Sequence, residues 1–105
     1  MTHLTEKLSR VDELVRDQIN TDLEAVLRLP QGRRFLALIL ERCGVHRNAY
    51  TGERGSTDFR LGEQNVALWL ISQIDEVSTI EYPALLMETA KLNEERRSAA
   101  VADDE

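Results

Sequence analysis

Apolar residues near the start of the chain recur at the spacing that places them on one face of a helix. The residues that form this face, four, three and four positions apart, are Leu4, Leu8, Val11 and Val15. Leu14 and Ile19 widen the face, and charged residues occupy most of the other positions. Residues 4–19 are therefore predicted to form an amphipathic helix. The same rhythm also begins a heptad seam, although it lasts for only about two heptads.

Two breaks are predicted in the next part of the chain. Residues 20–22 provide a break and a cap for a short helix that ends at Leu29, because the residue before a proline is driven out of the helical conformation. Pro30 suits the first turn of a further helix, which is predicted to run to Cys43. That helix is apolar around most of its circumference, so we expect it to be the central, buried one. Gly44 then provides a left-handed stop.

The second half of the chain predicts a loop, a long helix and a last helix. Residues 45–57 contain two glycines and no helical period, which indicates one long loop. In the helix expected over residues 57–77, Gly62 indicates a close approach to another helix. One apolar face of this helix is traced by Phe59, Val66, Trp69, Leu70 and Val77. The last helix begins around Pro83, and the charged residues after position 92 predict a frayed tail.

These elements predict an all-α fold, a small bundle of four to five helices with one long loop at about 45–57. The helices at about 30–43 and 57–77 are expected to pack together at its centre. The chain is accordingly divided into an N-terminal amphipathic helix (1–20), a helical core domain (21–92) and a charged, frayed C-terminal tail (93–105).

The charge of this chain is unevenly distributed. The 105 residues carry a formal net charge of −6, which disfavours general nucleic-acid binding through the phosphate backbone. Residues 28–60, however, hold seven arginines against three acidic residues, a local charge of +4. The arginines are Arg28, Arg33, Arg34, Arg42, Arg47, Arg54 and Arg60.

Several classes of protein are disfavoured by what the sequence contains. No apolar run approaches the roughly 18–20 residues of a membrane-spanning helix, so no membrane span is expected. Cys43 cannot form an internal disulfide, and with His3 and His46 it does not supply the converging donors of a metal site. Core packing is the favoured interpretation of Cys43. With no phosphate-binding loop or nucleophile motif in the sequence, we expect neither an enzyme nor a cofactor.

Four arginines of the basic segment are candidates for one binding surface: Arg33, Arg34, Arg47 and Arg54. Arginine grips carboxylate or phosphate through two parallel hydrogen bonds, so a cluster of them fits an acidic protein patch or a nucleic-acid backbone. The alternative is that each of these arginines pairs with the surplus acidic residues of the same chain. The sequence leaves both interpretations open.

A series of short motifs in the middle of the chain resembles a family of small tailed-bacteriophage proteins encoded among virion structure and assembly genes. The motifs are Pro30-Gln31-Gly32-Arg33-Arg34, Gly44-Val45, Thr51-Gly52, and Phe59 followed by Gly62 and Asn65. The resemblance covers about residues 22–90. It implies a virion-associated or assembly component, located in the virion or the host cytoplasm, and it brings no catalytic residue with it.

We therefore hypothesise a non-enzymatic interaction module that docks on other phage structural proteins or on a second copy of itself. The residues expected to make the contacts are Leu4, Leu8, Val11, Val15, Arg33, Arg34, Arg47 and Arg54. The alternative is a small phage regulator that binds nucleic acid or a host protein through the arginine-rich surface. Nucleic acid is the less favoured partner because of the net charge.

Overall fold

A computed structural model describes residues 2–44, 48–50 and 52–104 of the chain. Within these residues it contains four α-helices and no β-strand, which confirms the predicted all-α fold of four to five helices. In chain order they are α1 (Thr2–Leu27), α2 (Pro30–Arg42), α3 (Arg54–Val77) and α4 (Glu81–Asp104).

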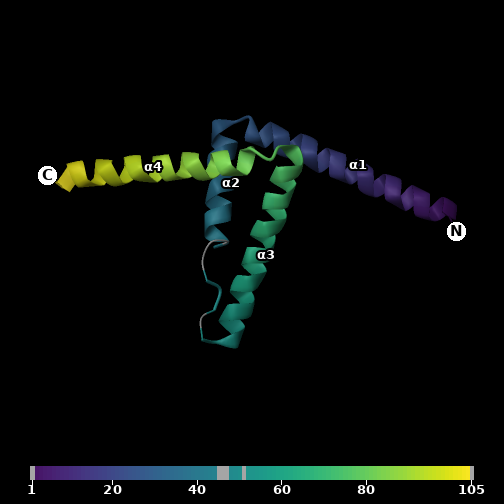
Figure 1. Cartoon of the computed structure of the whole chain (residues 1–105), viewed down its shortest axis with the longest axis horizontal. Helices are drawn as coiled ribbons and strands as arrows, with labels where there is room; N and C mark the ends of the chain where they lie inside the picture. Colours follow the sequence, from purple (N-terminus) through teal and green to yellow (C-terminus); the bar gives the residue numbers. More distant parts are fainter. Residues whose placement is uncertain (1, 45–47, 51, 105) are drawn as a thin grey trace.

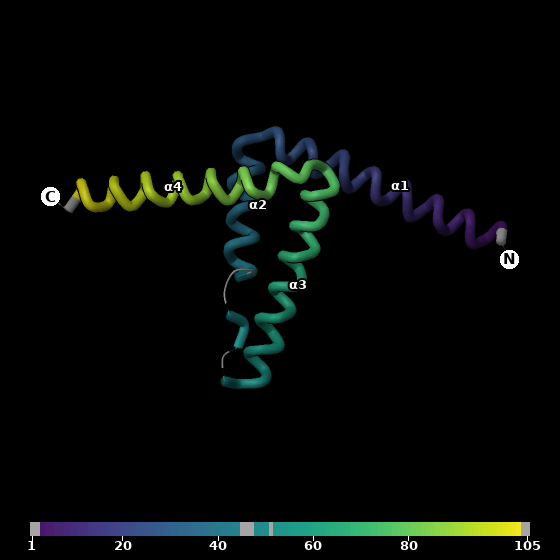
Figure 2. The backbone as a smooth tube through the Cα atoms, in the orientation of Figure 1, coloured from purple at the N-terminus to yellow at the C-terminus, as the bar shows by residue number. Residues whose placement is uncertain are grey.

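The four helices meet at one junction, from which α1 and α4 extend in opposite directions (Figure 1). α2 and α3 both extend from the junction toward the same side (Figure 1). The molecule measures 72 × 39 × 17 Å and has a radius of gyration of 18.5 Å, whereas a compact domain of this length has about 13 Å. The chain is therefore elongated, and the outer parts of α1 and α4 lie beyond the junction (Figure 2).

Seven apolar side chains from all four helices form the core of the junction. They are Leu23, Leu27, Leu36, Leu40, Ala67, Ile74 and Leu85. α1 packs most closely on α3, and α2 on α4, while direct packing between α2 and α3 is weaker than either. The prediction that α2 and α3 form a packed central pair is therefore wrong. The reason is that α1 and α4 complete the cluster that joins them.

α2 is also less buried than its composition indicates. Leu36 and Leu40 are buried, but Phe35 and Leu38 are 63% and 47% exposed. α3 is also mostly exposed, and its buried residues are Ala67 and Ile74. The predicted apolar face of α3 is therefore only partly a packing face, and its exposed members are Phe59, Val66 and Trp69.

The break that residues 20–22 predict is absent, because α1 runs through them as one helix. The side chain of Thr21 donates a hydrogen bond of 2.9 Å to the Asp17 carbonyl, and Gln18 donates one of 2.9 Å to Asp22. Both bonds join residues one helical turn apart, so these polar side chains bond within the continuing helix instead of capping a new one. The boundary at Leu29 is confirmed, since its backbone is extended directly before Pro30.

The helices extend into both segments that the sequence predicts as irregular, the loop at about 45–57 and the tail from residue 93. α3 begins at Arg54, so the helix takes up the last residues of the predicted loop. α4 continues to Asp104, where a frayed tail was expected from residue 93. Its last turns consist mostly of good helix formers, and Arg97 pairs with Glu94 at 3.4 Å along the helix.

Two glycines of the helices differ in their surroundings. A Cβ atom at Gly32 would lie 2.8 Å from Cγ1 of Val26 and still closer to the Val26 backbone oxygen, so α2 approaches the end of α1 through this glycine. Gly62 has nothing within 4 Å of the equivalent position. The close approach predicted for Gly62 is therefore wrong, and Gly32 makes it instead. Gly44 has a φ of 64°, which confirms the left-handed stop after α2.

The two glycines predict opposite effects of alanine. Gly32→Ala should lower the free energy of unfolding by about 1–3 kcal/mol, because the methyl group meets backbone that cannot move away freely. Gly62→Ala should raise it by up to about 1 kcal/mol, because alanine is the better helix former and space is open. Urea unfolding followed by circular dichroism measures both, and equal effects of the same sign would contradict the assignment.

Candidate functional site

The outer half of α1 presents an uncovered apolar surface. We define the α1 stripe as Leu4, Leu8, Val11 and Val15, the residues that the helical spacing brings to one face. Each of the four is between 54% and 60% exposed, and Leu14 beside them is 59% exposed. These are high values for large apolar side chains arranged along one face rather than scattered singly.

The α1 stripe ends where α1 reaches the rest of the protein. Arg16 forms an ion pair with Glu76 of α3, at 3.6 Å between Nε and Oε1. Ile19 is half-buried, and Leu23 and Leu27 belong to the core. One continuous helix therefore has an inner half that packs and an outer half, residues 4–15, that projects away from the junction (Figure 2). The stripe continues the helix whose inner half is anchored in the core.

Arg33 is occupied inside the fold. Its Nε donates to Glu88 at 3.0 Å, and its Nη1 donates to Glu81 and to the Leu27 carbonyl, the latter at 3.2 Å. The hydrogen bonds that Arg33 donates to Glu88, and then to Glu81, raise the pKa of Arg33 above its ordinary value, against the opposing effect of burial. With only 17% of its side chain exposed, Arg33 ties the start of α2 to α4 and to the end of α1.

The other candidate arginines do not join Arg33 on one surface. Arg34 is exposed beside it, whereas Arg54 lies at the start of α3, 96% exposed and 4.0 Å from Asp58. Arg33 contacts Glu81, which follows the other end of α3, and a helix of 24 residues is roughly 35 Å long. Arg47 lies outside the described residues. The single arginine surface that the sequence indicates is therefore not assembled among the described residues.

The crossing of α4 over α2 leaves an open groove of about 990 Å³ that also reaches the start of α3. Its arginines come from three helices and are Arg42, Arg60 and Arg96. Glu41 and Glu63 also line it, so its charge is mixed. Cys43 and Tyr82 form part of its wall and pack against the core. Burial, and then the charge of Asp75, raises the pKa of Tyr82.

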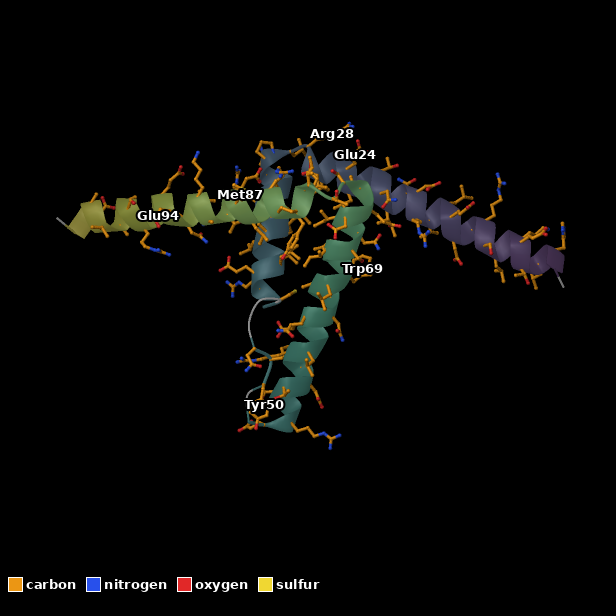
Figure 3. All side chains as sticks on the ribbon, viewed as in Figure 1. Glu24, Arg28, Tyr50, Trp69, Met87 and Glu94 are labelled. Atoms are coloured by element: carbon orange, nitrogen blue, oxygen red, sulfur yellow. The ribbon has the colours of Figure 1, made fainter. Side chains whose placement is uncertain are left out.

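The sequence does not predict this groove, nor the exposure of several further apolar side chains of α3 and α4. The groove depends on how α4 crosses α2, and no local motif carries that information. Phe59 and Trp69 of α3 are 70% and 54% exposed, and Met87 of α4 is 74% exposed. Figure 3 places Trp69 on α3 and Met87 on α4 near the junction. The spacing of apolar residues along each helix is the same for a face that packs and for a face that stays exposed, so it does not predict this exposure.

Two general features are absent from the part of the chain that the structure describes. No group of three or more His, Cys, Asp or Glu side chains is placed to hold a metal ion there. No helix within the same residues is both long enough and apolar enough to cross a membrane.

The chain was compared with known protein families, curated proteins and solved structures. The model of a family described as Bbp19-like phage protein matches residues 23–91, about two thirds of the chain. This match confirms the resemblance to a phage protein family. It begins at Leu23, the first core residue of α1, and ends within α4, so the α1 stripe lies outside it. No curated protein and no solved structure was found to match.

The position of Arg33 predicts a stability effect that its neighbour lacks. Arg33→Gln should lower the free energy of unfolding by about 1–2 kcal/mol, because it removes charged hydrogen bonds to two carboxylates, one of them half exposed and screened. Arg34→Gln is the matched control and should change it by less than about 0.5 kcal/mol. Thermal and urea unfolding measure the difference, and equal losses for the two variants would contradict the role of Arg33.

The separation of Arg34 from Arg54 predicts weak binding to nucleic acid. We expect no shift of a DNA or RNA fragment in a gel at low salt, because the net charge is negative and these two cations do not act together. A shift that weakens with salt, and weakens further in an Arg34→Ala, Arg54→Ala double variant, would instead support the regulator hypothesis.

Proposed function

The chain belongs to the Bbp19-like phage protein family, and from that premise we propose that it is a non-enzymatic interaction module that docks on other phage proteins during assembly or in the virion. The observation that carries this proposal is the α1 stripe, four large apolar side chains that stand uncovered on a projecting helix. Membership of a phage family supports a role among other phage proteins, and the exposed stripe supports a protein–protein contact.

The energy available from the stripe favours binding. Fully burying a Leu or Val side chain is worth roughly 1.5–3 kcal/mol, and side chains that are half exposed in the free chain still have about half of that to gain. Four such residues therefore contribute several kcal/mol to an interface before the cost of association is subtracted. An exposed apolar surface of this kind typically marks a contact with another protein.

The form of the stripe indicates how a partner recognises it. Anchors at spacings of three and four residues are read by an apolar groove or by another amphipathic helix. The rest of the outer half of α1 carries charges of both signs, among them Lys7, Arg10 and Asp12. Mixed charges at the rim of an apolar stripe keep the free protein in solution and favour one orientation of the partner.

The arginines have a lesser role in this proposal. Arg34 and Arg54 are exposed and can contact acidic groups of a partner separately, at opposite ends of α3. Arg33 is excluded from binding because its guanidinium is held by Glu81 and Glu88. Docking therefore rests mainly on the α1 stripe.

A single charge on the stripe should abolish docking. Leu8→Asp and Val11→Asp, each made alone, should remove the protein from purified phage particles and their assembly intermediates, as measured by mass spectrometry, because a carboxylate is costly to bury in an apolar contact. Ser9→Asp adds the same charge one position away, off the stripe, and should leave the amount unchanged. Normal incorporation of Leu8→Asp and Val11→Asp would contradict the proposal.

A further inference from the structure

We infer that the partner of the α1 stripe is the same stripe of a second copy, with the two α1 helices parallel. This inference rests on the proposed function, in which the stripe is a protein interface, and it assigns that interface to a second copy, so that the dimer and not the single chain is the form that joins other phage proteins. The elements that carry it are the exposed area of the chain, the direction in which α1 projects and the charges beside the stripe.

The exposed area of the chain is larger than a self-sufficient monomer has. Its accessible surface is 8366 Å², whereas a compact monomer of 12.0 kDa exposes about 6,000 Å². The excess of about 2,400 Å² is at the upper end of what one chain loses in an obligate interface, because such interfaces bury roughly 2,000–5,000 Å² over both partners. It is shared between the projecting parts of α1 and α4. Part of this excess lies on the outer half of α1, where the large apolar side chains stand uncovered.

No described part of the same chain covers the stripe. The outer half of α1 projects away from the junction, and α4 projects in the opposite direction (Figure 1). α2 and α3 extend to one side of the line that these two helices form (Figure 2). Because no described residue covers residues 4–15, we assign the covering surface to another molecule.

The stripe is complementary to itself at its centre. In heptad terms Leu8 and Val15 occupy a positions, and Leu4 and Val11 occupy d positions, which is the seam through which two helices interlock. The free chain already holds this segment helical because its inner half is fixed in the core. Pairing therefore does not require nucleation of a new helix, which is the step that makes short isolated helices unstable.

The residues that flank the seam favour the parallel arrangement. Lys7 occupies a g position and Asp12 the e position five residues later. In a parallel pair each Lys7 lies beside Asp12 of the other copy, which gives two symmetric ion pairs across the seam. The next flanking residue in the outer half of α1, Leu14, is apolar and 59% exposed, so it adds to the apolar contact. The apolar and the charged contacts thus coincide in one register.

An antiparallel pair does not reuse these charges. With the seam residues in register, Lys7 then lies beside Leu14, and Asp12 beside Thr5 of the other copy. Neither contact joins opposite charges. A groove on a different protein would use the same apolar residues, but it would give no reason for Lys7 and Asp12 to stand five positions apart on either side of the seam.

The first experiment measures the mass of the full chain in solution. Light scattering after size-exclusion chromatography, at roughly 100 μM protein, should give twice the 12.0 kDa chain mass. Leu8→Asp should give the chain mass, and Ser9→Asp, the matched control, should stay at twice that mass. Both substituted residues are exposed in the free chain, so neither substitution should disturb its fold. Circular dichroism of each variant checks this. A wild-type monomer, or a Leu8→Asp dimer, would overturn the inference.

The second experiment tests the orientation by exchanging the flanking charges. Lys7→Glu and Asp12→Lys, each alone, place like charges beside each other in a parallel pair and should raise the dimer dissociation constant by about fivefold or more. The double variant restores opposite charges and should return the constant to within about twofold of the wild type. Sedimentation at several concentrations measures all four proteins. Equal constants for the four proteins would overturn the parallel arrangement.

Failure of the dimer inference and failure of the proposed function give different results in these experiments. A wild type that is monomeric in solution while Leu8→Asp still disappears from phage particles would overturn the inference and leave the function standing. A dimer that Leu8→Asp dissociates, with particle incorporation unchanged, would support the inference and contradict docking through the stripe.

Discussion

The structure depends on a single shared junction. Seven apolar side chains from four helices are buried there, and Arg33 links α2, α4 and the end of α1 around them. The helices are much longer than the junction they share, so their outer parts find nothing to pack against within the described chain. This mismatch between helix length and core size is the physical origin of the exposed α1 stripe. The projecting helix is therefore a consequence of how the core is built, not a separate feature.

The sequence predicts the helices better than their packing. The period of apolar residues is a local property, and it identified all four helices and the boundary at Pro30. The expected break at residues 20–22 was wrong because Thr21 bonds within the helix, which its residue type alone does not reveal. The roles of Gly32 and Gly62 were likewise indistinguishable without knowing where the end of α1 lies. Packing partners depend on contacts between distant residues, which one sequence does not report.

The candidate site shows the same division. The α1 stripe was predicted residue by residue, because its spacing is a property of one helix. The sequence did not correctly predict the arginine surface, because Arg34 and Arg54 lie about one helix length apart. Arg33 took the alternative that the sequence left open, pairing with acidic residues of its own chain. Charge clustering along a chain thus predicts a shared surface only when the fold returns those residues to one place.

The central claim is that the outer half of α1 is covered by another molecule in the working state of the protein. Hydrogen exchange of the backbone amides of residues 4–15 tests it most directly, measured in dilute protein, in concentrated protein and in purified particles. The account predicts that the amides of residues 4–15 exchange faster in dilute solution than in the other two samples, with the amides of residues 16–27 and of α2, α3 and α4 unchanged. Equally fast exchange of residues 4–15 in all three samples would contradict it.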